Sequence, residues 1–330
     1  MISSEIGIGI VVIGRNEGQR LINCLKSVKM ASAVIVYVDS GSSDNSITAA
    51  QNLGVSVVSL DMTQPFTAAR ARNEGFAALM KLNPQIRFVQ FIDGDCELAP
   101  SWLDTALAFL AQRKDVAVAC GRRRERHPDA SIYNRFCDIE WETPIGDAAL
   151  CGGDLIVRSD AYKAVGGFRR QLIAGEEPEL CLRLREQGWK VWRLDAEMTQ
   201  HDAAITRFSQ WWLRGVRSGY GCAEVARLHR NSKSRVLDGV VRRAIFWAGL
   251  VPLAIALGTL LHRAAIAAVL IYPIQVSRIA LRRNAARSTS WTYGLFIMLA
   301  KFAELQGILK YYLYRLSGNA ATLIEYKKAD

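Results

Sequence analysis

Apolar runs of strand length alternate with segments of helical periodicity along the front of the chain. Strands are predicted at residues 8–13, 34–38, 55–60, 88–92, 116–120 and 189–194. Between them, helices are predicted at residues 20–28, 45–53 and 101–112, with a further helix starting in 66–76 and another that follows 174–184 and ends near Gly188. This alternation is typical of an α/β protein with a largely parallel sheet. Residues 121–142 follow neither period, and we expect them to form a long irregular loop, either a lid or one wall of a binding site.

The pattern changes in the last third of the chain. Two uncharged runs, 244–261 and 264–277, are each near the lower length limit for crossing a hydrocarbon core of about 30 Å. We expect them to form a helical hairpin, about 244–280, that dips into a membrane from one side. Residues 291–316 are amphipathic and are predicted to lie in the membrane interface. A buried helical subdomain of a soluble protein is the alternative.

Charge is divided as unevenly as hydropathy. The net charge of +11 is the sum of −2 over residues 1–200 and +13 over residues 201–330. A basic region with apolar runs between its charges favours an anionic membrane surface over nucleic acid. Seven cysteines without C-x-x-C or zinc-finger spacing indicate reduced thiols in a protein that faces the cytosol. We therefore predict an α/β domain at 1–225 and a basic, membrane-associated helical region at 226–330.

The chemistry centres on Asp93-Gly94-Asp95, which follows the apolar run at 88–92 directly. Open α/β sheets hold their ligands at the carboxyl ends of strands, where these two carboxylates are expected. Two neighbouring carboxylates repel each other, and oxygen ligands suit a hard ion such as Mg²⁺ or Mn²⁺. The simpler interpretation of this motif taken alone is a solvated acidic loop.

Other strand and helix ends carry polar groups as well. The loop at 14–18 is not G-x-G-x-x-G, so a dinucleotide fingerprint is not supported. Asp39 ends the second strand, where its carboxylate can accept a hydrogen bond from a ribose hydroxyl or a base imide. Glu176, Glu177 and Glu179 crowd the start of one helix, where capping and the helix dipole alone would favour them.

Several basic residues have more than one interpretation. Arg70 and Asn73 lie on one helix face, where they face phosphates, clamp the Asp-Gly-Asp loop, or are simply solvated. Arg214 and Arg217 also share a face and are candidates to grip a diphosphate. His201, at the end of strand-like residues, is either a packed histidine or a metal ligand.

Taken in order, these pieces resemble the family 2 glycosyltransferases, whose catalytic domain has the GT-A fold. The resemblance covers about residues 7–225 and rests on short motifs at 11–17, 39–44, 69–73, 93–95, 152–153, 166–168 and 175–180. Their order and spacing together are specific. The acidic motif reads Glu176-Glu177 where the family has Glu-Asp, so which carboxylate is the base stays open. The Gln-x-x-Arg-Trp motif of the polymerising members is not intact, which argues against a processive synthase.

The resemblance implies roles on the donor side of a reaction. Asp95 would bind a divalent ion, Mg²⁺ or Mn²⁺, that bridges a diphosphate, with His201 and Asp93 as further metal-site residues. Together with the basic residues above, the expected nucleotide contacts are Ile13, Arg15, Asn16, Glu17, Asp39, Arg70, Asp93, Arg214 and Arg217.

On the acceptor side, Glu177, or else Glu176, would remove the proton of a hydroxyl, while Gly152, Gly153 and Asp154 would border the acceptor. The implied reaction is inverting transfer from a UDP- or GDP-linked sugar to a glycan or polyprenyl-linked acceptor, with membrane lipid as a further partner and no nucleic acid. The basic, apolar tail is similar to that of bacterial members that build exopolysaccharides or envelope glycans. The implied location is the cytoplasmic face of the inner membrane.

Two other classes fit part of the pattern. A sugar-nucleotide nucleotidyltransferase would need a glycine- and lysine-rich triphosphate loop near the start, and the segment at 14–18 has only Arg15. A non-catalytic nucleotide-binding membrane scaffold would bind nucleotide without turnover. Release of pyrophosphate from a nucleoside triphosphate would identify the first, and binding without any product would identify the second.

Overall fold

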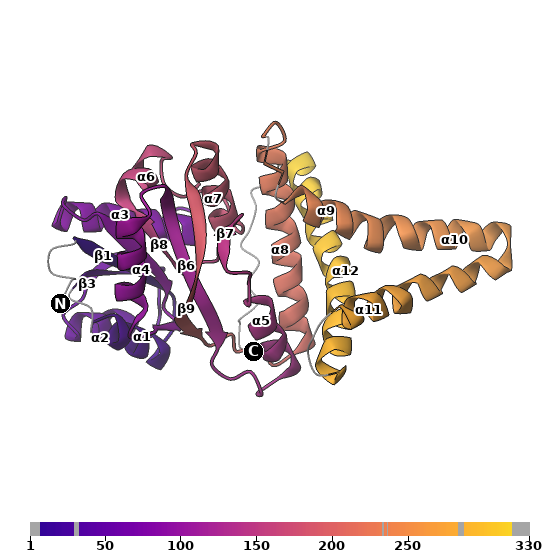
Figure 1. The fold of residues 1–330 in the computed structure, drawn as a ribbon, viewed down its shortest axis with the longest axis horizontal. Coiled ribbons are helices and arrows are strands. Elements are labelled where there is room, and N and C mark those ends of the chain that lie inside the picture. Colours follow the sequence, from indigo (N-terminus) through magenta and orange to yellow (C-terminus); the bar gives the residue numbers. More distant parts are fainter. Residues whose placement is uncertain (1–6, 30–32, 233, 236, 283–286, 319–330) are drawn as a thin grey trace. The chain divides into compact units, whose positions relative to one another are not determined.

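A computed structural model describes residues 7–29, 33–232, 234, 235, 237–282 and 287–318 (Figure 1). The chain forms two compact units, Met1–Thr206 and Arg207–Asp330. The first contains the sheet and the second is helical, which confirms the predicted fold class.

One mixed sheet organises the first unit. Its strands are β1 (Ile8–Gly14), β2 (Val34–Asp39), β3 (Ser56–Ser59), β4 (Phe88–Asp93), β5 (Cys96–Leu98), β6 (Val116–Glu125), β7 (Gly146–Ala148), β8 (Leu155–Arg158) and β9 (Lys190–His201). Their order is β3-β2-β1-β4-β8-β6-β9-β5, and β7 pairs with β9 outside this path. The β3-β2-β1-β4 half is parallel, while β8 runs antiparallel to both of its neighbours.

Helices pack against this sheet (Figure 1). They are α1 (Gln19–Lys29), α2 (Ser46–Asn52), α3 (Ala68–Leu82), α4 (Trp102–Gln112), α5 (Ile132–Glu140), α6 (Ser159–Ala164) and α7 (Glu176–Glu186). Helix α3 begins after Thr67, whose side chain accepts a hydrogen bond from the amide of Arg70, a common N-cap. A Cβ added at Gly75 would lie 2.4 Å from Val11 Cγ1, so glycine lets α3 approach the sheet closely.

The parallel pairing brings three predicted strand ends to one edge. Gly14 is the partner of Asp39 in the β1–β2 ladder, and Ile13 is the partner of Asp93 in the β1–β4 ladder. Almost all residues of β1 and β4 are buried. This burial fixes the register of the two strands, because a shift by one residue would turn their apolar side chains outward. The carboxylates of Asp39 and Asp93 therefore lie at the carboxyl edge of the sheet, as the sequence predicted.

The prediction of an irregular loop at 121–142 is wrong. Strand β6 continues to Glu125, and α5 forms at Ile132–Glu140. The arginines within β6 have partners on neighbouring elements: Arg122 pairs with Asp138 at 3.0 Å and Arg124 with Glu197 at 2.7 Å. Strand β9 likewise runs beyond the predicted 189–194, because it pairs with the whole of β6. The short strands β5, β7 and β8 were not predicted.

The second unit consists of helices. They are α8 (Phe208–Leu228), α9 (Asp238–Ala244), a π-helical segment at Ile245–Leu250, α10 (Val251–Leu261), a 3₁₀ segment at Arg263–Leu270, α11 (Ile271–Leu281) and α12 (Arg287–Ser317). Figure 1 shows the segments from α9 to α11 as a long hairpin. Three stretches are long and apolar enough to cross a membrane: Asp238–Leu261, Arg263–Leu281 and Thr289–Ser317.

Helices α8 and α12 touch through glycines. A Cβ at Gly219 would lie 2.1 Å from the carbonyl oxygen of Glu304, and one at Gly307 would lie 2.0 Å from that of Val216. This close approach covers part of α12: a third of its most apolar window is buried, against 17% and 6% for the two arms of the hairpin. The two arms of the hairpin therefore expose most of their apolar surface.

Candidate active site

The Asp-Gly-Asp turn is fixed to the first strand. The amide of Gly94 donates a hydrogen bond of 2.8 Å to the carbonyl oxygen of Ile13. A Cβ at this position would lie 3.1 Å from the same oxygen and 3.4 Å from Glu17 Cγ, so a side chain there would crowd the turn. The turn thus holds Asp93 and Asp95 in defined positions at the sheet edge, and it leads directly into β5.

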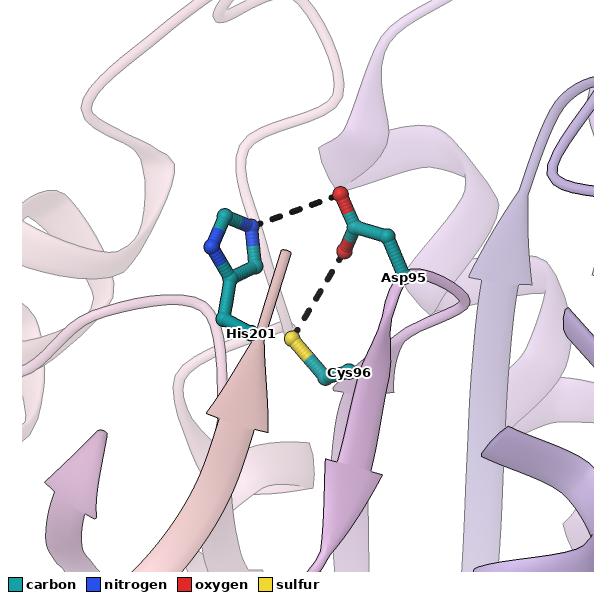
Figure 2. Close-up of side chains that lie close together, drawn as sticks. All are labelled: Asp95, Cys96 and His201. Atoms are coloured by element: carbon teal, nitrogen blue, oxygen red, sulfur yellow. Dashed lines mark hydrogen bonds and ion pairs between the residues drawn. The ribbon is translucent and has the colours of Figure 1, made fainter. Parts of the chain in front are cut away.

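Asp95 faces His201. The short strand β5 pairs with the end of β9, and in this register Cys96 is the partner of His201. As Figure 2 shows, the imidazole of His201 points toward Asp95, with 3.3 Å between Nε2 and Oδ2. Both side chains are nearly buried, with exposed fractions of 6% for His201 and 8% for Asp95. This brings together two of the predicted metal-site residues.

The donor atoms at this point fit a hard divalent ion. A carboxylate oxygen is a ligand that both Mg²⁺ and Mn²⁺ prefer, and an imidazole nitrogen suits a transition ion such as Mn²⁺ better than Mg²⁺. Cys96 Sγ also lies within 4.8 Å of the Asp95 and His201 ligand atoms. Burial raises the pKa of the Cys96 thiol well above its usual value, and sulfur is a soft ligand that suits Mg²⁺ and Mn²⁺ poorly. Asp95 and His201 are therefore the residues that would hold the ion.

Asp93 has different partners from Asp95. Its Oδ1 lies 2.9 Å from Arg72 Nη2, and its Oδ2 lies 3.4 Å from Arg123 Nη2. Burial alone would raise the pKa of Asp93, but the two guanidinium groups outweigh it and hold the pKa below its usual range. Asp93 is thus a permanent anion paired with two arginines. Its direct contact with a metal stays a prediction.

Arg72 links the end of β4 to the start of α7. Its Nη1 lies 3.0 Å from Glu176 Oε1 and 3.0 Å from Glu177 Oε1, while its Nη2 pairs with Asp93. The side chain is only 3% exposed. Arg72 was not among the predicted site residues, although Ala69 and Phe76, three residues before and four after it, place it on the apolar face of α3. A buried arginine on such a face needs carboxylate partners, and that signal could have identified it.

Glu176 and Glu177 begin α7, preceded by Gly175 in a left-handed conformation with φ of 80°. Burial and the neighbouring charge of Glu176 raise the pKa of Glu177 to about 7, against the opposing effect of Arg72. A carboxylate with such a pKa can exchange a proton with a hydroxyl near neutral pH. The third acidic residue, Glu179, is fully buried and binds Arg169 at 3.0 Å and Arg183 at 2.6 Å, so it has a structural role.

Gly153 lies against the same charged groups. A Cβ added there would be 2.7 Å from Arg72 Nη2, 3.0 Å from Asp93 Oδ2 and 3.2 Å from Glu177 Oε1. Only a glycine permits this approach without displacing one of the three side chains. At the adjacent Gly152, by contrast, an added Cβ would meet no described atom within 4 Å. Both were expected to border an acceptor, which stays a prediction.

Asp154 is buried beneath this cluster and supports it. One oxygen accepts a hydrogen bond of 3.2 Å from the amide of Asp93. The other accepts bonds of 2.8 Å from Arg123 Nε and 2.6 Å from Thr199 Oγ1. Asp154 therefore orients Arg123 toward Asp93. Arg123 itself was not a candidate, because it belonged to the segment predicted to be irregular.

The two expected nucleotide loops are tied to each other. Asn16 has a φ of 56°, its amide donates to Ser42 Oγ at 2.9 Å, and its Oδ1 accepts from the amide of Ser43 at 2.7 Å. Asp39 is 1% exposed and accepts hydrogen bonds from the hydroxyl of Tyr37 and the amides of Gly41 and Ser42. These contacts shape a single loop surface beside Ile13, Arg15 and Glu17. Nucleotide binding by these residues stays a prediction.

Three further arginines predicted to contact nucleotide, Arg70, Arg214 and Arg217, lie in helices outside these loops. Arg70 donates to the carbonyl oxygens of Asp61, Gln64 and Pro65. The alternative in which Arg70 clamps the Asp-Gly-Asp loop is therefore wrong, because its guanidinium stabilises the segment after β3 instead. Arg214 and Arg217 belong to α8 in the second unit, and their contact with a diphosphate stays a prediction.

A mixed sheet of this order, with an Asp-Gly-Asp turn at its carboxyl edge and a histidine beside it, defines a GT-A type of nucleotide-diphospho-sugar transferase fold. Comparisons with known proteins agree. Residues 9–164 match the family model of Glycosyl transferase family 2. The match covers just under half of the chain and supports the resemblance inferred from the motifs.

Solved structures share this fold. The mannosyltransferase PcManGT from Pyrobaculum calidifontis, in complex with GDP-Man and Mn²⁺, has a TM-score of 0.60 at 13% identity, covering 92% of this chain and 86% of that one. Residues 1–349 of TarS from S. aureus, in complex with UDP-GlcNAc, give a TM-score of 0.50 at 13% identity, covering 95% and 93%.

Among curated proteins, the pre-mycofactocin glycosyltransferase of Mycobacterium tuberculosis is 24% identical over 246 residues. The match covers 68% of this chain and 49% of that protein, so the chain spans about half the length of the curated relatives it matches.

Proposed function

We propose that this protein transfers a sugar from a UDP- or GDP-linked donor to a hydroxyl of a lipid-linked or polysaccharide acceptor, with inversion at the anomeric carbon. The observation that carries the proposal is the position of Arg72. One buried guanidinium joins Asp93, at the donor-side turn, to Glu177, at the start of α7. The carboxylates expected for the donor and for the base are thus held within the reach of a single side chain.

On the donor side, the leaving nucleoside diphosphate gains negative charge as the sugar departs. A divalent ion on Asp95 and His201 would neutralise part of that charge when bound. Arg72 and Arg123 already lie beside Asp93 with their guanidinium groups charged and oriented. Preorganised positive groups of this kind stabilise developing charge strongly in a site with little water.

On the acceptor side, Glu177 is the group suited to act as base. Its carboxylate lies beside Gly153, and the missing side chain there lets Glu177 pack close to Arg72 and Asp93. A base with a pKa of about 7 combines a substantial deprotonated fraction with useful proton affinity. Attack by the activated hydroxyl on the face opposite the diphosphate then inverts the anomeric centre in one displacement.

The second unit supports a membrane location for this chemistry. The uncharged part of Asp238–Leu261, residues 244–261, has 18 residues, or roughly 27 Å of helix at about 1.5 Å per residue, close to a hydrocarbon core of about 30 Å. Arg242 and Arg243 lie near one base of the hairpin, and Arg278 and Arg282 near the other. Such clusters favour the cytoplasmic side. We propose that the protein acts there, at the inner membrane, in envelope glycan or exopolysaccharide synthesis.

Fractionation tests the membrane part of the proposal. The full-length protein should sediment with membranes and stay there in high salt and at alkaline pH, because the hairpin inserts apolar surface. Extraction should require detergent. Recovery in the soluble fraction at low salt, without detergent, would reject membrane insertion.

The transfer reaction is tested with a panel of UDP- and GDP-sugars in the presence of Mn²⁺. Asp95→Asn should lower transfer by about 10²-fold or more, since it removes a charge that acts on the transition state. Asp115→Asn is the matched control, because Asp115 is exposed and pairs with Arg113 and Lys190 on the surface. Undiminished transfer by Asp95→Asn would reject the metal role. Pyrophosphate release from a nucleoside triphosphate would instead identify a nucleotidyltransferase.

A further inference from the structure

A second buried carboxylate lies beside His201. Glu125 ends strand β6 and is 4% exposed. In the β6–β9 ladder its partner is His201 itself. The imidazole therefore has a carboxylate near each of its nitrogens: Asp95 Oδ2 lies 3.3 Å from Nε2, and Glu125 Oε2 lies 3.9 Å from Nδ1. The proposed function assigns no role to Glu125.

The nitrogen that faces Glu125 lacks a partner. His201 Nδ1 is buried and has no hydrogen-bond partner among the described residues. Figure 2 shows this nitrogen on the side of the ring that points away from Asp95. The ring is also packed against Trp141 in an edge-to-face contact, with 4.9 Å between centroids. Leaving a buried polar nitrogen unpaired is destabilising, so a partner for it is expected in the working state.

Glu125 is held rigidly enough to supply that partner. Its Oε1 accepts hydrogen bonds from the amide of His127 at 3.0 Å and from Asn134 Nδ2 at 3.3 Å. Its Oε2 accepts one from the amide of Ala203 at 2.9 Å. A carboxylate oxygen can accept more than one hydrogen bond, so Oε2 keeps capacity for His201. A movement of about 1 Å would convert the 3.9 Å approach into a hydrogen bond.

We propose that Glu125 is a positioning residue that accepts a hydrogen bond from Nδ1–H of His201 and so keeps the Nε2 lone pair free for a divalent ion. A neutral imidazole carries one proton, on either nitrogen. A carboxylate can only accept, so Glu125 favours the tautomer with the proton on Nδ1. Nε2, on the side of Asp95, is then unprotonated and available as a ligand. Partners of this kind commonly change metal affinity by about 10- to 100-fold.

This inference rests on the metal site of the proposed function, and the first test measures the ion alone. Isothermal titration of Mn²⁺ into the full-length protein in detergent compares the wild type with Glu125→Gln. The amide of glutamine can donate to Nδ1 and so favours the tautomer with the proton on Nε2. We expect the Kd for Mn²⁺ to rise by about 10- to 100-fold.

Asp138→Asn is the matched control. Asp138 accepts a hydrogen bond from the backbone amide of Glu125 at 2.9 Å and pairs with Arg122, so the variant disturbs the same region without touching His201. It should bind Mn²⁺ within about 2-fold of the wild type. Equal loss in both variants would assign Glu125 a merely structural role and overturn the proposal.

A second measurement needs no variant of Glu125 and so does not depend on its folding. Imidazole ¹⁵N spectra of the metal-free wild type, with the His201 signals assigned by their loss in His201→Gln, should show the proton on Nδ1. A proton on Nε2 would overturn the proposal. If the wild type binds Mn²⁺ and Glu125→Gln binds it equally well, only this inference fails. If the wild type binds no Mn²⁺, the metal role in the proposed function fails with it.

Discussion

Replacing Glu176 by glutamine should shift the pH dependence of sugar transfer. The charge of Glu176 is one of the causes that raise the pKa of Glu177 to about 7. Removing that charge makes the deprotonated form of Glu177 more favourable, so its pKa falls. Since a base must be deprotonated to act, kcat/KM of the wild type should rise with pH to a plateau, with its midpoint near 7. In Glu176→Gln the midpoint should move to lower pH.

The contacts with Arg72 give the size of the shift. The Oε1 atoms of Glu176 and Glu177 each lie 3.0 Å from the same Nη1 atom, so they are at most about 6 Å apart, twice that distance. At an effective dielectric constant of about 20, two unit charges about 6 Å apart repel each other by roughly 3 kcal/mol. One pKa unit corresponds to about 1.4 kcal/mol. Allowing for partial solvent screening, we expect a downward shift of about 1 to 2 pH units.

The assay is the initial rate of transfer at subsaturating donor and acceptor between about pH 5 and 9, because kcat/KM reports the pKa of the free enzyme. Glu186→Gln is the control: Glu186 is exposed at the far end of the same helix and should leave the midpoint unchanged. Glu177→Gln should abolish the rise with pH together with most of the rate. An unchanged or higher midpoint in Glu176→Gln would refute Glu177 as the titrating base.

Two further variants test packing around the site and beneath it. Gly153→Ala should lower transfer by 10-fold or more, because its Cβ would lie within 3.2 Å of three charged side-chain atoms. The control Gly152→Ala should be nearly neutral, because its Cβ would meet no described atom within 4 Å. Equal effects of the two variants on transfer would refute the crowding argument. Gln90→Leu should destabilise the protein by about 1–3 kcal/mol in denaturant unfolding, because the buried Trp102 Nε1 loses its 2.8 Å acceptor. The exposed Gln51→Leu should change stability by less than about 0.5 kcal/mol, and a similar loss in both would contradict the assignment to the hydrogen bond.

The residues at the sheet edge could be predicted because the features that mark a strand and its end lie next to each other in the sequence. A buried strand reads as an apolar run, and the residue after the run marks the edge of a parallel sheet. Asp39 and Asp93 were placed in this way, and the ladders through β1 confirm both positions. The start of α7, marked by Gly175 and a series of acidic residues, was equally visible.

The parts that could not be predicted depend on contacts between distant residues. Arg123 occurs in a strand whose charged side chains hide the apolar pattern, and it is stabilised there by Asp154, 31 residues further on. Arg72 acquires its role only when α7 brings Glu176, 104 residues away, against α3. In each case the charged side chain is stable because its partner lies on another element. The spacing of apolar residues along the sequence does not identify that partner.

The most direct test of the central claim is a crystal structure of the full-length protein with Mn²⁺ and a nucleoside diphosphate. We predict an anomalous Mn²⁺ peak between Asp95 and His201, the diphosphate in contact with that ion, and the Glu177 carboxylate facing the vacant sugar position. A nucleotide bound away from Asp93 and Asp95, or a Glu177 side chain turned away from the diphosphate, would contradict the account.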